Sequence, residues 1–596
     1  MIESTFFLSL RKKQMLRKRW VQHDDDNEDI VEKLATTLKI DHILARLLAQ
    51  RGICTYAEAR DFFRPSLDSL HDPFLLKDMD LAIERIERAL DQGERILIYG
   101  DYDVDGTTAV ALVYDFLKDF HSNIDYYIPD RYKEGYGVSL ESIDYALETG
   151  VSLIISLDCG IKAQKQIKYA TDSGIDFIVV DHHRPDNVPL TALAVVDPKQ
   201  PDCEYPYKEL SGCGLGFKLA QAFYQKRRLP FEGLEKFLDL VVVSIAADVV
   251  PITGENRVLA YYGIKRLNFD PRAGFESILF YSNVFRKTKP GKGSSFTKEL
   301  SVSDLMFMIG PKINAAGRIE KGKKAVDLLV CKKMGETHEL TIAINDNNTE
   351  RRSLDTDITR QAMSMITSDP DLKNSKATIL FDPGWHKGVI GIVASRLIES
   401  YYRPTIILTE SNGLITGSAR SVKDFDVYNA IDACSDLLEH FGGHKYAAGL
   451  SLRPENLDAF KDKFMQFVED TITDEMLVPQ IEVHAEISLG GIAGRFFRVL
   501  KQFAPFGPGN PNPVFVSRNC VVQGNVRVVG NKHLKFRVSQ PGLGNVEMPA
   551  IAFQQGYQLI NMKACKSFDL AYQIEENEWN GRVSLQLNVK DIKFSQ

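Results

Sequence analysis

The chain has 596 residues, more than one hydrophobic core normally serves, so we expect several domains. Its composition, 44% hydrophobic and 26% charged, is that of an ordinary globular protein, and no apolar run approaches the about 20 residues that cross a membrane. The net charge of −7 gives no global sign of a nucleic-acid-binding protein, although an acidic total can hide a basic groove. The eight cysteines form no C-x-x-C pair, which argues against structural zinc or a disulfide framework and fits a reducing cytoplasm.

The N-terminal part divides into two predicted segments. Residues 1–14 contain an apolar run too short for a signal peptide, and their charges follow that run instead of preceding it. We therefore expect an unfolded extension ahead of a more natural start at Met15. Residues 15–75 are predicted to form a small cap of helices and irregular segments.

Residues 76–275 are predicted to form an α/β domain. Four continuous, β-branched apolar runs, at 94–100, 152–158, 176–181 and 192–197, are typical of parallel strands buried on both faces. Helical stretches between them complete a βαβ pattern. Residues from 231 to 275 are predicted to be helical.

Three further segments follow toward the C-terminus. Residues 276–370 are predicted to contain a basic loop, RKTKPGKGSSFTK (286–298), and a long connecting helix. A second α/β domain is expected over 371–472. Residues 473–596 alternate apolar and polar side chains and carry an Asn580-Gly581 hairpin signal, so we expect an all-β barrel or sandwich.

Acidic residues stand where the predicted strands end. Asp101, Asp103 and Asp105 follow the first strand, Asp158 ends the second, and Asp181-His182-His183 ends the third. The carboxyl ends of parallel strands face one crevice, in which ligands bind. Carboxylates at this density repel one another unless cations neutralise them, and carboxylate with imidazole suits Mn²⁺ or Mg²⁺.

Simpler interpretations exist for each part of this pattern. An Asp at a strand end is often only a helix N-cap, and Asp-Gly is often only a turn. The triple-Asp loop is also like a Ca²⁺ loop, but it lacks the downstream Glu ligand and follows a strand. Capping explains one such position better than it explains several at successive strand ends.

The motifs DYDVDG and DHH, each after a strand and with an Asp between them, resemble those of the DHH phosphoesterase superfamily. Its members use two divalent metals, usually manganese, to split phosphoesters or phosphoanhydrides. The segment SIAADVVP supplies a fourth motif. The resemblance implies the metal ligands Asp103, Asp105, Asp158, His182 and Asp248, with Asp101 and His183 as further ligands or as groups that orient them.

Further motifs resemble those of one branch of this superfamily, the RecJ exonucleases, over about residues 15–590. They are DPKQPDCEYPYKELSGCGLGFKLA (197–220), PKINAAGRIE (311–320), GWHKGVIGIVASRL (384–397), GSARSV (417–422), FGGHKYAAGL (441–450) and FAPFGPGNPNPVF (503–515). The resemblance implies that the second α/β domain binds substrate and that the C-terminal module is an OB-fold. The implied substrate-binding residues are Lys312, Asn314, Arg318, Ser418, Arg420, Gly442, Gly443 and His444. RecJ proteins commonly carry Arg where this chain has Lys312, and a Lys contacts phosphate without the planar fork of Arg.

We therefore expect a single-stranded-DNA-specific 5′–3′ exonuclease that acts in DNA repair and recombination by a two-metal mechanism, with two Mn²⁺ or Mg²⁺ ions. Asp158 or Asp105 is predicted to bridge the metals, His182 to ligate one or orient a carboxylate, and His183 and His444 to hydrogen-bond the scissile phosphate. Asp158, His182 and His183 are thus the predicted catalytic residues. A groove between the two α/β domains would admit one strand but not a duplex. Two alternatives stay open: a nucleotide or cyclic-dinucleotide phosphodiesterase of the same superfamily, and a non-catalytic DNA-binding scaffold.

DNA contacts outside the active site are also expected. Lys532, Lys535, Phe536 and Arg537 combine basic groups with an aromatic ring, as suits single-strand binding, although a solvated β-surface is the simpler interpretation. The 286–298 loop has the same two interpretations. By resemblance alone, the partners are single-stranded DNA, a single-stranded-DNA-binding protein and a RecQ-type helicase, with no membrane.

Overall fold

A computed structural model describes residues 16–23, 27–135, 137–186, 188–289, 293–319, 322–492, 494–543, 546–579 and 582–595. The predicted extension over 1–14 lies outside this range, as do Asn580 and Gly581. By internal contacts the chain falls into two units, of which Asp61–Arg351 and Phe503–Pro511 form unit 2. Unit 1 holds the residues up to Arg60, Arg352–Gln502 and Asn512–Gln596. The finer division into domains stays a prediction from the sequence.

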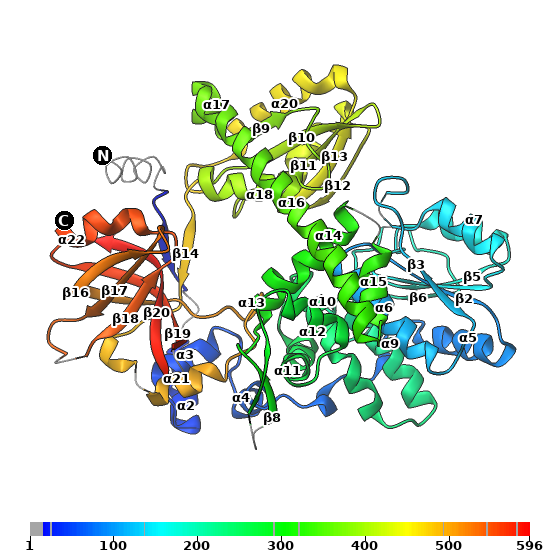
Figure 1. The fold of residues 1–596 in the computed structure, drawn as a ribbon, viewed down its shortest axis with the longest axis horizontal. Coiled ribbons are helices and arrows are strands. Elements are labelled where there is room, and N and C mark those ends of the chain that lie inside the picture. The colour runs from blue at the N-terminus through cyan, green and yellow to red at the C-terminus, as the bar shows by residue number, and fades with distance from the viewer. Residues whose placement is uncertain are drawn as a thin grey trace. The chain divides into compact units, whose positions relative to one another are not determined.

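The centre of unit 2 is a five-stranded parallel sheet in the order β3-β2-β4-β5-β6 (Figure 1). Its strands are β2 (Ile96–Gly100), β3 (Ile124–Tyr127), β4 (Leu153–Leu157), β5 (Asp176–Val180) and β6 (Ala194–Val196). β2, β4 and β6 are buried at every residue, which explains why they are continuous apolar runs. The predicted parallel sheet is confirmed.

Helices cover both faces of this sheet. Ile96 and Ile98 share a core with α5 (Met79–Gln92), α6 (Val104–Lys118), α9 (Gly212–Lys226) and α10 (Leu238–Ala247). Leu97 and Tyr99 point to the other face, into a core with α7 (Leu140–Glu148) and α8 (Gln164–Asp172). Alternate side chains of a strand thus serve opposite layers. α11 (Gly254–Phe269) and α12 (Ala273–Phe280) follow, with short 3₁₀ turns at η1 (Leu67–Ser69), η2 (Pro73–Leu75) and η3 (Phe231–Phe237).

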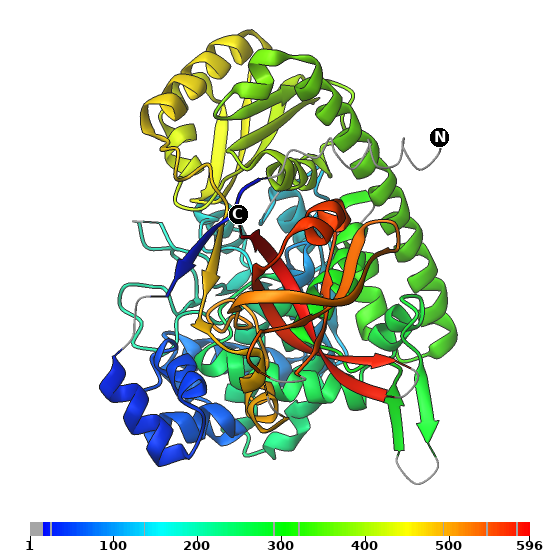
Figure 2. The same cartoon turned by 90° about the vertical axis from the view of Figure 1, so that its left-hand side faces the viewer.

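The segment that leads out of unit 2 is a hairpin and a series of helices. The predicted basic loop instead contains the antiparallel strands β7 (Arg286–Lys289) and β8 (Gly293–Phe296), which project from the helices of their unit (Figures 1 and 2). The loop interpretation failed because Arg286-Lys287-Thr288-Lys289 has no apolar alternation to mark a strand. α13 (Val302–Asp304), a π-turn η4 (Leu305–Ile309), α14 (Gly310–Ile319) and α15 (Lys323–Val330) lead to the 35-residue α16 (Met334–Ser368), the expected connecting helix.

Unit 1 contains a second five-stranded sheet, in the order β12-β13-β11-β10-β9. Only β9 (Thr378–Phe381) and β10 (Thr405–Ser411) pair in parallel, while β11 (Leu414–Arg420), β13 (Ala447–Leu452) and β12 (His440–His444) continue it antiparallel. The helices of this segment are α17 (Pro370–Asn374), α18 (Ile390–Tyr401), α19 (Val427–Asp432) and α20 (Leu457–Thr471), with η5 (Ser435–Leu437) and η6 (Pro454–Asn456).

The C-terminal part of unit 1 is a closed β-barrel. β16 (Phe515–Val529), β17 (His533–Ser539), β18 (Met548–Ala552), β20 (Arg582–Phe594) and β19 (Phe568–Trp579) pair in that order, and β19 also pairs with β16. Closure by five strands is the OB-fold arrangement. α21 (Gly494–Lys501), α22 (Leu559–Ala564), β15 (Ala485–Glu486), η7 (Leu489–Gly491) and η8 (Gly556–Gln558) complete it. The pairing Trp579–Arg582 confirms the predicted hairpin.

The N-terminal residues of unit 1 contact this barrel. β1 (Arg19–Gln22) pairs in parallel with β14 (Gln480–Val483), and Trp20 Nε1 donates to Asp591 Oδ2 at 2.8 Å. α2 (Glu28–Leu38), α3 (His42–Ala49) and α4 (Tyr56–Phe63) follow, with Arg495 bonding to the carbonyl of Lys39.

The segment Phe503–Pro511 is separated in sequence from the rest of unit 2 but packs within it. Arg257 lies across the Phe62 ring and donates to the carbonyls of Phe62, Phe503 and Ala504. Ile252 N also donates to Pro508 O at 2.7 Å. The buried Arg257 guanidinium and this backbone hydrogen bond thus hold Phe503–Pro511, which we call the strap, in unit 2.

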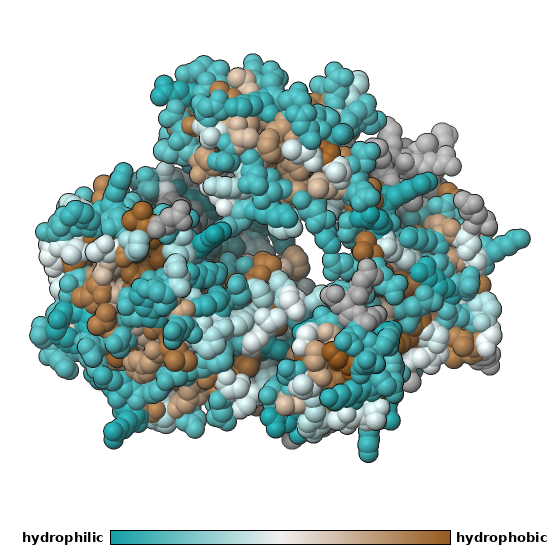
Figure 3. Space-filling model, turned by 180° about the vertical axis from the view of Figure 1, so that it is seen from behind, coloured by the Kyte–Doolittle hydropathy of each residue, from teal (hydrophilic) through white to brown (hydrophobic). Residues whose placement is uncertain are grey.

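On the face shown in Figure 3, hydrophilic residues predominate and hydrophobic ones lie in scattered patches. No helix among the described residues is long and apolar enough to cross a membrane.

Candidate metal centre and substrate contacts

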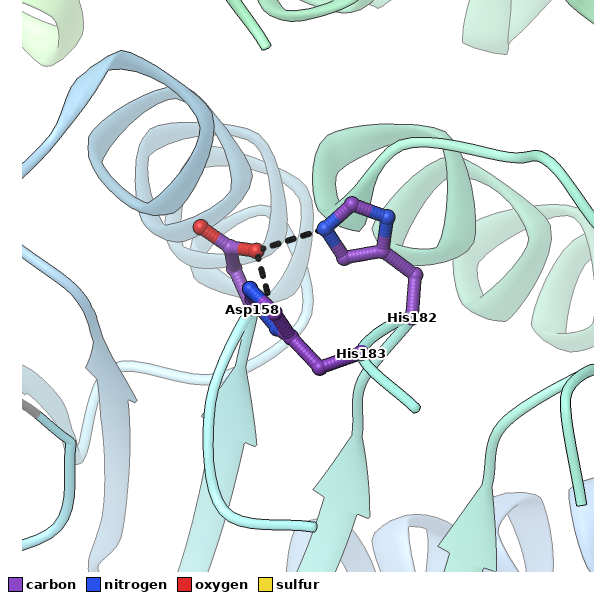
Figure 4. Close-up of side chains that lie close together, drawn as sticks. All are labelled: Asp158, His182 and His183. Atoms are coloured by element: carbon purple, nitrogen blue, oxygen red, sulfur yellow. Dashed lines mark ion pairs between the residues drawn. The ribbon is translucent and has the colours of Figure 1, made fainter. Parts of the chain in front are cut away.

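The residues predicted to bind metal, apart from Asp248, lie at or just beyond the carboxyl ends of strands of unit 2. Asp158 directly follows β4 and His182 and His183 follow β5, so the three side chains meet (Figure 4). Asp158 Oδ1 lies 3.1 Å from His182 Nε2 and 3.9 Å from His183 Nδ1. Asp158 has φ 59°, a left-handed conformation that non-glycine residues rarely adopt and that is often found at functional sites.

Asp105 is held in place by backbone amides. It lies in the first turn of α6, and its carboxylate accepts hydrogen bonds from the N–H groups of Gly212 and Cys213, at 2.7 and 2.8 Å, and from Ser244 Oγ at 2.6 Å. Gly212 and Cys213 begin α9, so the positive end of that helix stabilises the carboxylate. Gly212 is required here because an added Cβ would lie 2.6 Å from Cβ of Asp158.

His182 links these acids to a fourth segment. Its Nε2 lies 3.6 Å from Asp105 Oδ2 and 3.6 Å from Asp248 Oδ2. Asp248 caps the end of α10, and the loop after it reaches Ile252, which is bonded to the strap. Asp158, His182 and His183 form one possible ligand group, and Asp105, His182 and Asp248 form another. His182 belongs to both.

Asp101 and Asp103 complete the acidic set. Asp101 follows β2 and is buried, while Asp103 caps α6 by accepting from Gly106 N at 3.0 Å. The capping interpretation is therefore correct for Asp103, and it leaves the second carboxylate oxygen for another role. Close packing explains Gly106, where an added Cβ would lie 2.5 Å from the carbonyl oxygen of Asp101.

The site fits a divalent cation. Among the described residues, Asp101 Oδ1, Asp158 Oδ1 and both ring nitrogens of His182 are buried and accept or donate no hydrogen bond. Buried polar atoms are rarely left without a partner, and one bound cation would satisfy carboxylate and imidazole atoms together. Carboxylate oxygens and imidazole are ligands for Mn²⁺ and Mg²⁺, whereas no thiolate joins the two ligand groups.

The pKa values of the acids support the same conclusion. Burial, with the charges of neighbouring acids, raises the pKa of Asp101, Asp103 and Asp158, and it raises the pKa of Asp248 to about 8. Such carboxylates hold protons unless a cation replaces them. Burial lowers the pKa of His182, which keeps its imidazole neutral and able to ligate a metal.

Asp181 and His183 form an ion pair beside this set. Asp181 accepts from the backbone N–H groups of Ile161, His182 and His183, and its Oδ1 lies 2.8 Å from His183 Nδ1. Burial opposes ionisation of both groups. The hydrogen bond between them, the nearby opposite charges and the backbone N–H groups that donate to Asp181 together outweigh burial, so the pKa of Asp181 falls to about 2 and that of His183 rises to about 9. Without a bound cation, His183 is therefore protonated at neutral pH.

Four of the five substrate-binding residues predicted in unit 1 share one face of its sheet, and Gly443 lies between two of them. Ser418 and Gly442 lie on either side of Gly449, and Arg420 and His444 lie on either side of Ala447. Residues aligned across neighbouring strands point the same way. Gly443 has φ 148°, and an added Cβ would meet Ala447 O at 2.3 Å.

Arg420 lies against the start of α18. Its Nη1 donates to Ser418 Oγ at 2.9 Å, and a Cβ added at Gly391 would lie 2.8 Å from both Arg420 Nη2 and Ser418 Oγ. No carboxylate pairs with Arg420 among the described residues, so the interpretation of Arg420 as a partner of an acid in its own domain has no support. A guanidinium, a hydroxyl and a helix N-terminus together suit a phosphate.

Lys312, Asn314 and Arg318 lie on α14, in unit 2. Lys312 is buried, and Asn314 and Arg318 are half-buried. α14 packs against the loop that carries Asp101 and Asp103, since a Cβ added at Gly317 would meet Tyr102 O at 2.5 Å.

Three family descriptions match the chain: the DHH family N-terminal domain over residues 95–245, the DHHA1 domain over 374–470 and the RecJ OB domain over 483–591. The single-stranded-DNA-specific exonuclease RecJ of Bacillus subtilis is 34% identical over 97% of this chain and 71% of that protein. The RecJ of Escherichia coli is 30% identical over 98% of this chain and all of that protein. The chain belongs to the RecJ family.

A solved structure of the RecJ family supports the fold throughout. The crystal structure of Thermus thermophilus RecJ with Mn²⁺ matches 97% of this chain and 80% of its own, with 27% identity and a TM-score of 0.81. A structure of the same protein with Mg²⁺ matches with a TM-score of 0.75. Relatives have thus been solved with both cations expected from the donor atoms of this site.

The RecJ-type site contains residues that the sequence interpretation missed. Arg131 follows β3, lies 5.0 Å from the Tyr102 ring centroid, and its charge lowers the pKa of Asp101 against the larger effect of burial. Asp197 follows β6, is buried and has its pKa raised to about 7 by burial. Both follow strands, so a search for polar residues after β3 and β6, as was made for the other strands, would have found them. Ser244 gave no signal in the sequence.

One predicted single-strand contact in the RecJ OB domain is wrong. Phe536 is only 3% exposed and packs edge-on against Phe568, so no base can stack on it. Arg537 is paired with Glu547 at 2.8 Å. The exposed ring nearby is Phe553, 5.1 Å from that of His533. DNA contact by Lys532 and Lys535 stays a prediction.

Proposed function

We propose that this chain is a single-stranded-DNA-specific 5′–3′ exonuclease that hydrolyses phosphodiester bonds with two divalent cations, Mn²⁺ or Mg²⁺. The observation that carries the proposal is the set of buried, unsatisfied ligand atoms on Asp101, Asp158 and His182, which the neighbouring carboxylates surround. The substrate is inferred from the relatives, which are named as single-stranded-DNA-specific exonucleases.

The proposed ligands are Asp103, Asp105, Asp158, His182 and Asp248, with Asp101 as a further ligand. Divalent cations here would lower the pKa of a coordinated water and neutralise charge on the phosphoryl oxygens. Asp105 is oriented for this by the amides of α9, and His182 presents a neutral imidazole.

His183 and Arg420 supply the positive charges of the protein itself. The His183 imidazolium, fixed by Asp181, donates a hydrogen bond to a non-bridging oxygen of the scissile phosphate, where negative charge develops. Ser418, Arg420 and the glycines of β12, with His444, bind phosphate, and the residues of α14 contact the strand next to the metal centre. Lys312 lacks the planar guanidinium of an Arg, so its contact with phosphate is weaker, although its positive charge remains.

The cellular setting follows the family. We propose action in DNA repair and recombination, with a single-stranded-DNA-binding protein and a RecQ-type helicase as partners. All eight cysteines are free and none forms a disulfide, as suits the reducing cytoplasm.

The test uses a 30-nucleotide strand labelled at its 5′-phosphate or at its 3′ end, with Mn²⁺. The proposal predicts immediate release of a labelled mononucleotide from the first substrate and progressive shortening of the second. The matching duplex should be resistant. Turnover of dinucleotides without action on the 30-mer would establish the phosphodiesterase alternative, which the RecJ OB domain match already disfavours.

A further inference from the structure

Exposed aromatic side chains gather on unit 2, apart from the residues assigned to the active site. Phe269, at the end of α11, is 74% exposed; Phe280, at the end of α12, is 52% exposed; and Phe285, before β7, is 40% exposed. With Tyr281 and His338 they form what we call the aromatic patch. Large apolar side chains exposed as a group commonly mark a binding surface.

Four of the five rings of the aromatic patch, all but Phe269, contact one another. The Phe280 centroid lies 5.4 Å from that of Phe285 and 5.6 Å from that of Tyr281. Tyr281 in turn lies 5.2 Å from His338, and its hydroxyl is 2.8 Å from His338 Nε2. Arg286 Nη1 donates a hydrogen bond to the carbonyl of Phe269, which joins the end of α11 to the first residue of β7.

Basic side chains lie along the same elements. Lys265 stands one helical turn before Phe269 on α11, and its Nζ is 4.0 Å from the Tyr261 centroid. Lys287, on β7, is exposed and forms no ion pair with any residue that the structure describes. Residues 261–310 contain eight Lys and Arg against four Asp and Glu, a local surplus of positive charge in a chain of net charge −7.

We propose that the aromatic patch, with Lys265 and Lys287, is a second contact surface for single-stranded DNA, which binds a part of the strand outside the active site. The proposal rests on the proposed function. Bases stack on exposed rings while phosphates meet neighbouring cations, and every base has a face that can stack. The core of a protein-binding surface is instead depleted of charge.

The test compares a 6-nucleotide with a 40-nucleotide oligothymidylate. The variants are Phe280→Ala/Phe285→Ala and Lys265→Gln/Lys287→Gln, and Tyr169→Ala and Lys165→Gln are controls on exposed residues of α8. KM and kcat for cleavage are measured with Mn²⁺, and affinity is measured by fluorescence anisotropy without metal.

The phenylalanine variant should raise KM and Kd for the 40-mer at least about fivefold, and leave the 6-mer and kcat unchanged. The lysine variant should reduce the slope of log Kd against log salt by about 0.7 for each lysine that contacts phosphate. Unchanged binding of the 40-mer would overturn the proposal and leave the patch as a protein-binding surface. Equal weakening for both lengths would also overturn it, because the effect would then pass through the active site.

The proposed exonuclease function and the proposed DNA contact at the aromatic patch can be contradicted independently of each other. If wild-type protein cleaves neither oligonucleotide, the proposed exonuclease function is wrong, and the anisotropy measurement still decides whether the aromatic patch binds DNA.

Discussion

Asp181 Oδ1 lies 2.8 Å from His183 Nδ1, and this half-buried contact helps to raise the pKa of the imidazole to about 9. Asp181→Asn keeps the size of the side chain but removes its charge. Since His183 would then no longer be held as a cation, kcat should fall about 10- to 100-fold at pH 8, with little change in KM. Steady-state kinetics measures this, and Asp186→Asn, on the same loop, should keep wild-type activity. Equal kcat values in the two variants would remove His183 from the mechanism.

The cation should stabilise the protein more at high pH than at low pH. In the metal-free protein the pKa of Asp248 is about 8, above the ordinary value of 3.8, so the folded state binds more protons than the unfolded state between those values. The contribution of Asp248 to the stability of the metal-free protein therefore falls as pH rises from about 4 to 8. The increase in unfolding midpoint on adding Mn²⁺ should be larger at pH 8 than at pH 6. A larger increase at pH 6, measured by scanning calorimetry, would contradict the ligand assignment.

The site residues that directly follow strands could be predicted from the sequence. Continuous apolar runs identify β2, β4 and β5, and parallel order then places Asp101, Asp158 and His182 at one edge. Phe536 shows the limit: a strand of a closed barrel has an inner and an outer face, and the sequence does not say which face a ring between two basic residues occupies. The packing of the strap on Ile252 could not be predicted from the sequence either, because it joins residues about 250 positions apart.

Arg420 should distinguish strands by their 5′ ends. A terminal phosphate carries about one more negative charge than an internal one. Loss of a charge-assisted bidentate contact costs about 1.5–3 kcal/mol, so Arg420→Ala should lower kcat/KM on 5′-phosphorylated strands about 10- to 100-fold. Strands with a 5′-hydroxyl should be affected much less. Slowing by one common factor for both substrates, in a folded variant, would show that Arg420 has only a structural role.

Arg257 should be a main source of stability in unit 2. It is buried and satisfies the carbonyls of Phe62, Phe503 and Ala504, which Arg257→Ala would leave without this donor. The expected loss is about 3 kcal/mol, measured by denaturant unfolding. Arg266→Ala, on the same helix, removes a partly exposed pair with Asp270 and should cost under about 1 kcal/mol. Similar losses in the two variants would mean that the strap is not anchored by Arg257.

The most direct test of the account follows a 5′-³²P-labelled 30-nucleotide strand with wild-type protein and with His182→Ala, whose imidazole belongs to both ligand groups. With Mn²⁺, wild-type protein should release labelled mononucleotide, and EDTA should abolish the release. His182→Ala should stay folded and bind the strand but retain less than about a hundredth of the activity, since loss of a shared ligand affects both cations. Cleavage by wild-type protein in EDTA, or more than a tenth of wild-type activity in His182→Ala, would contradict the proposed metal-dependent mechanism.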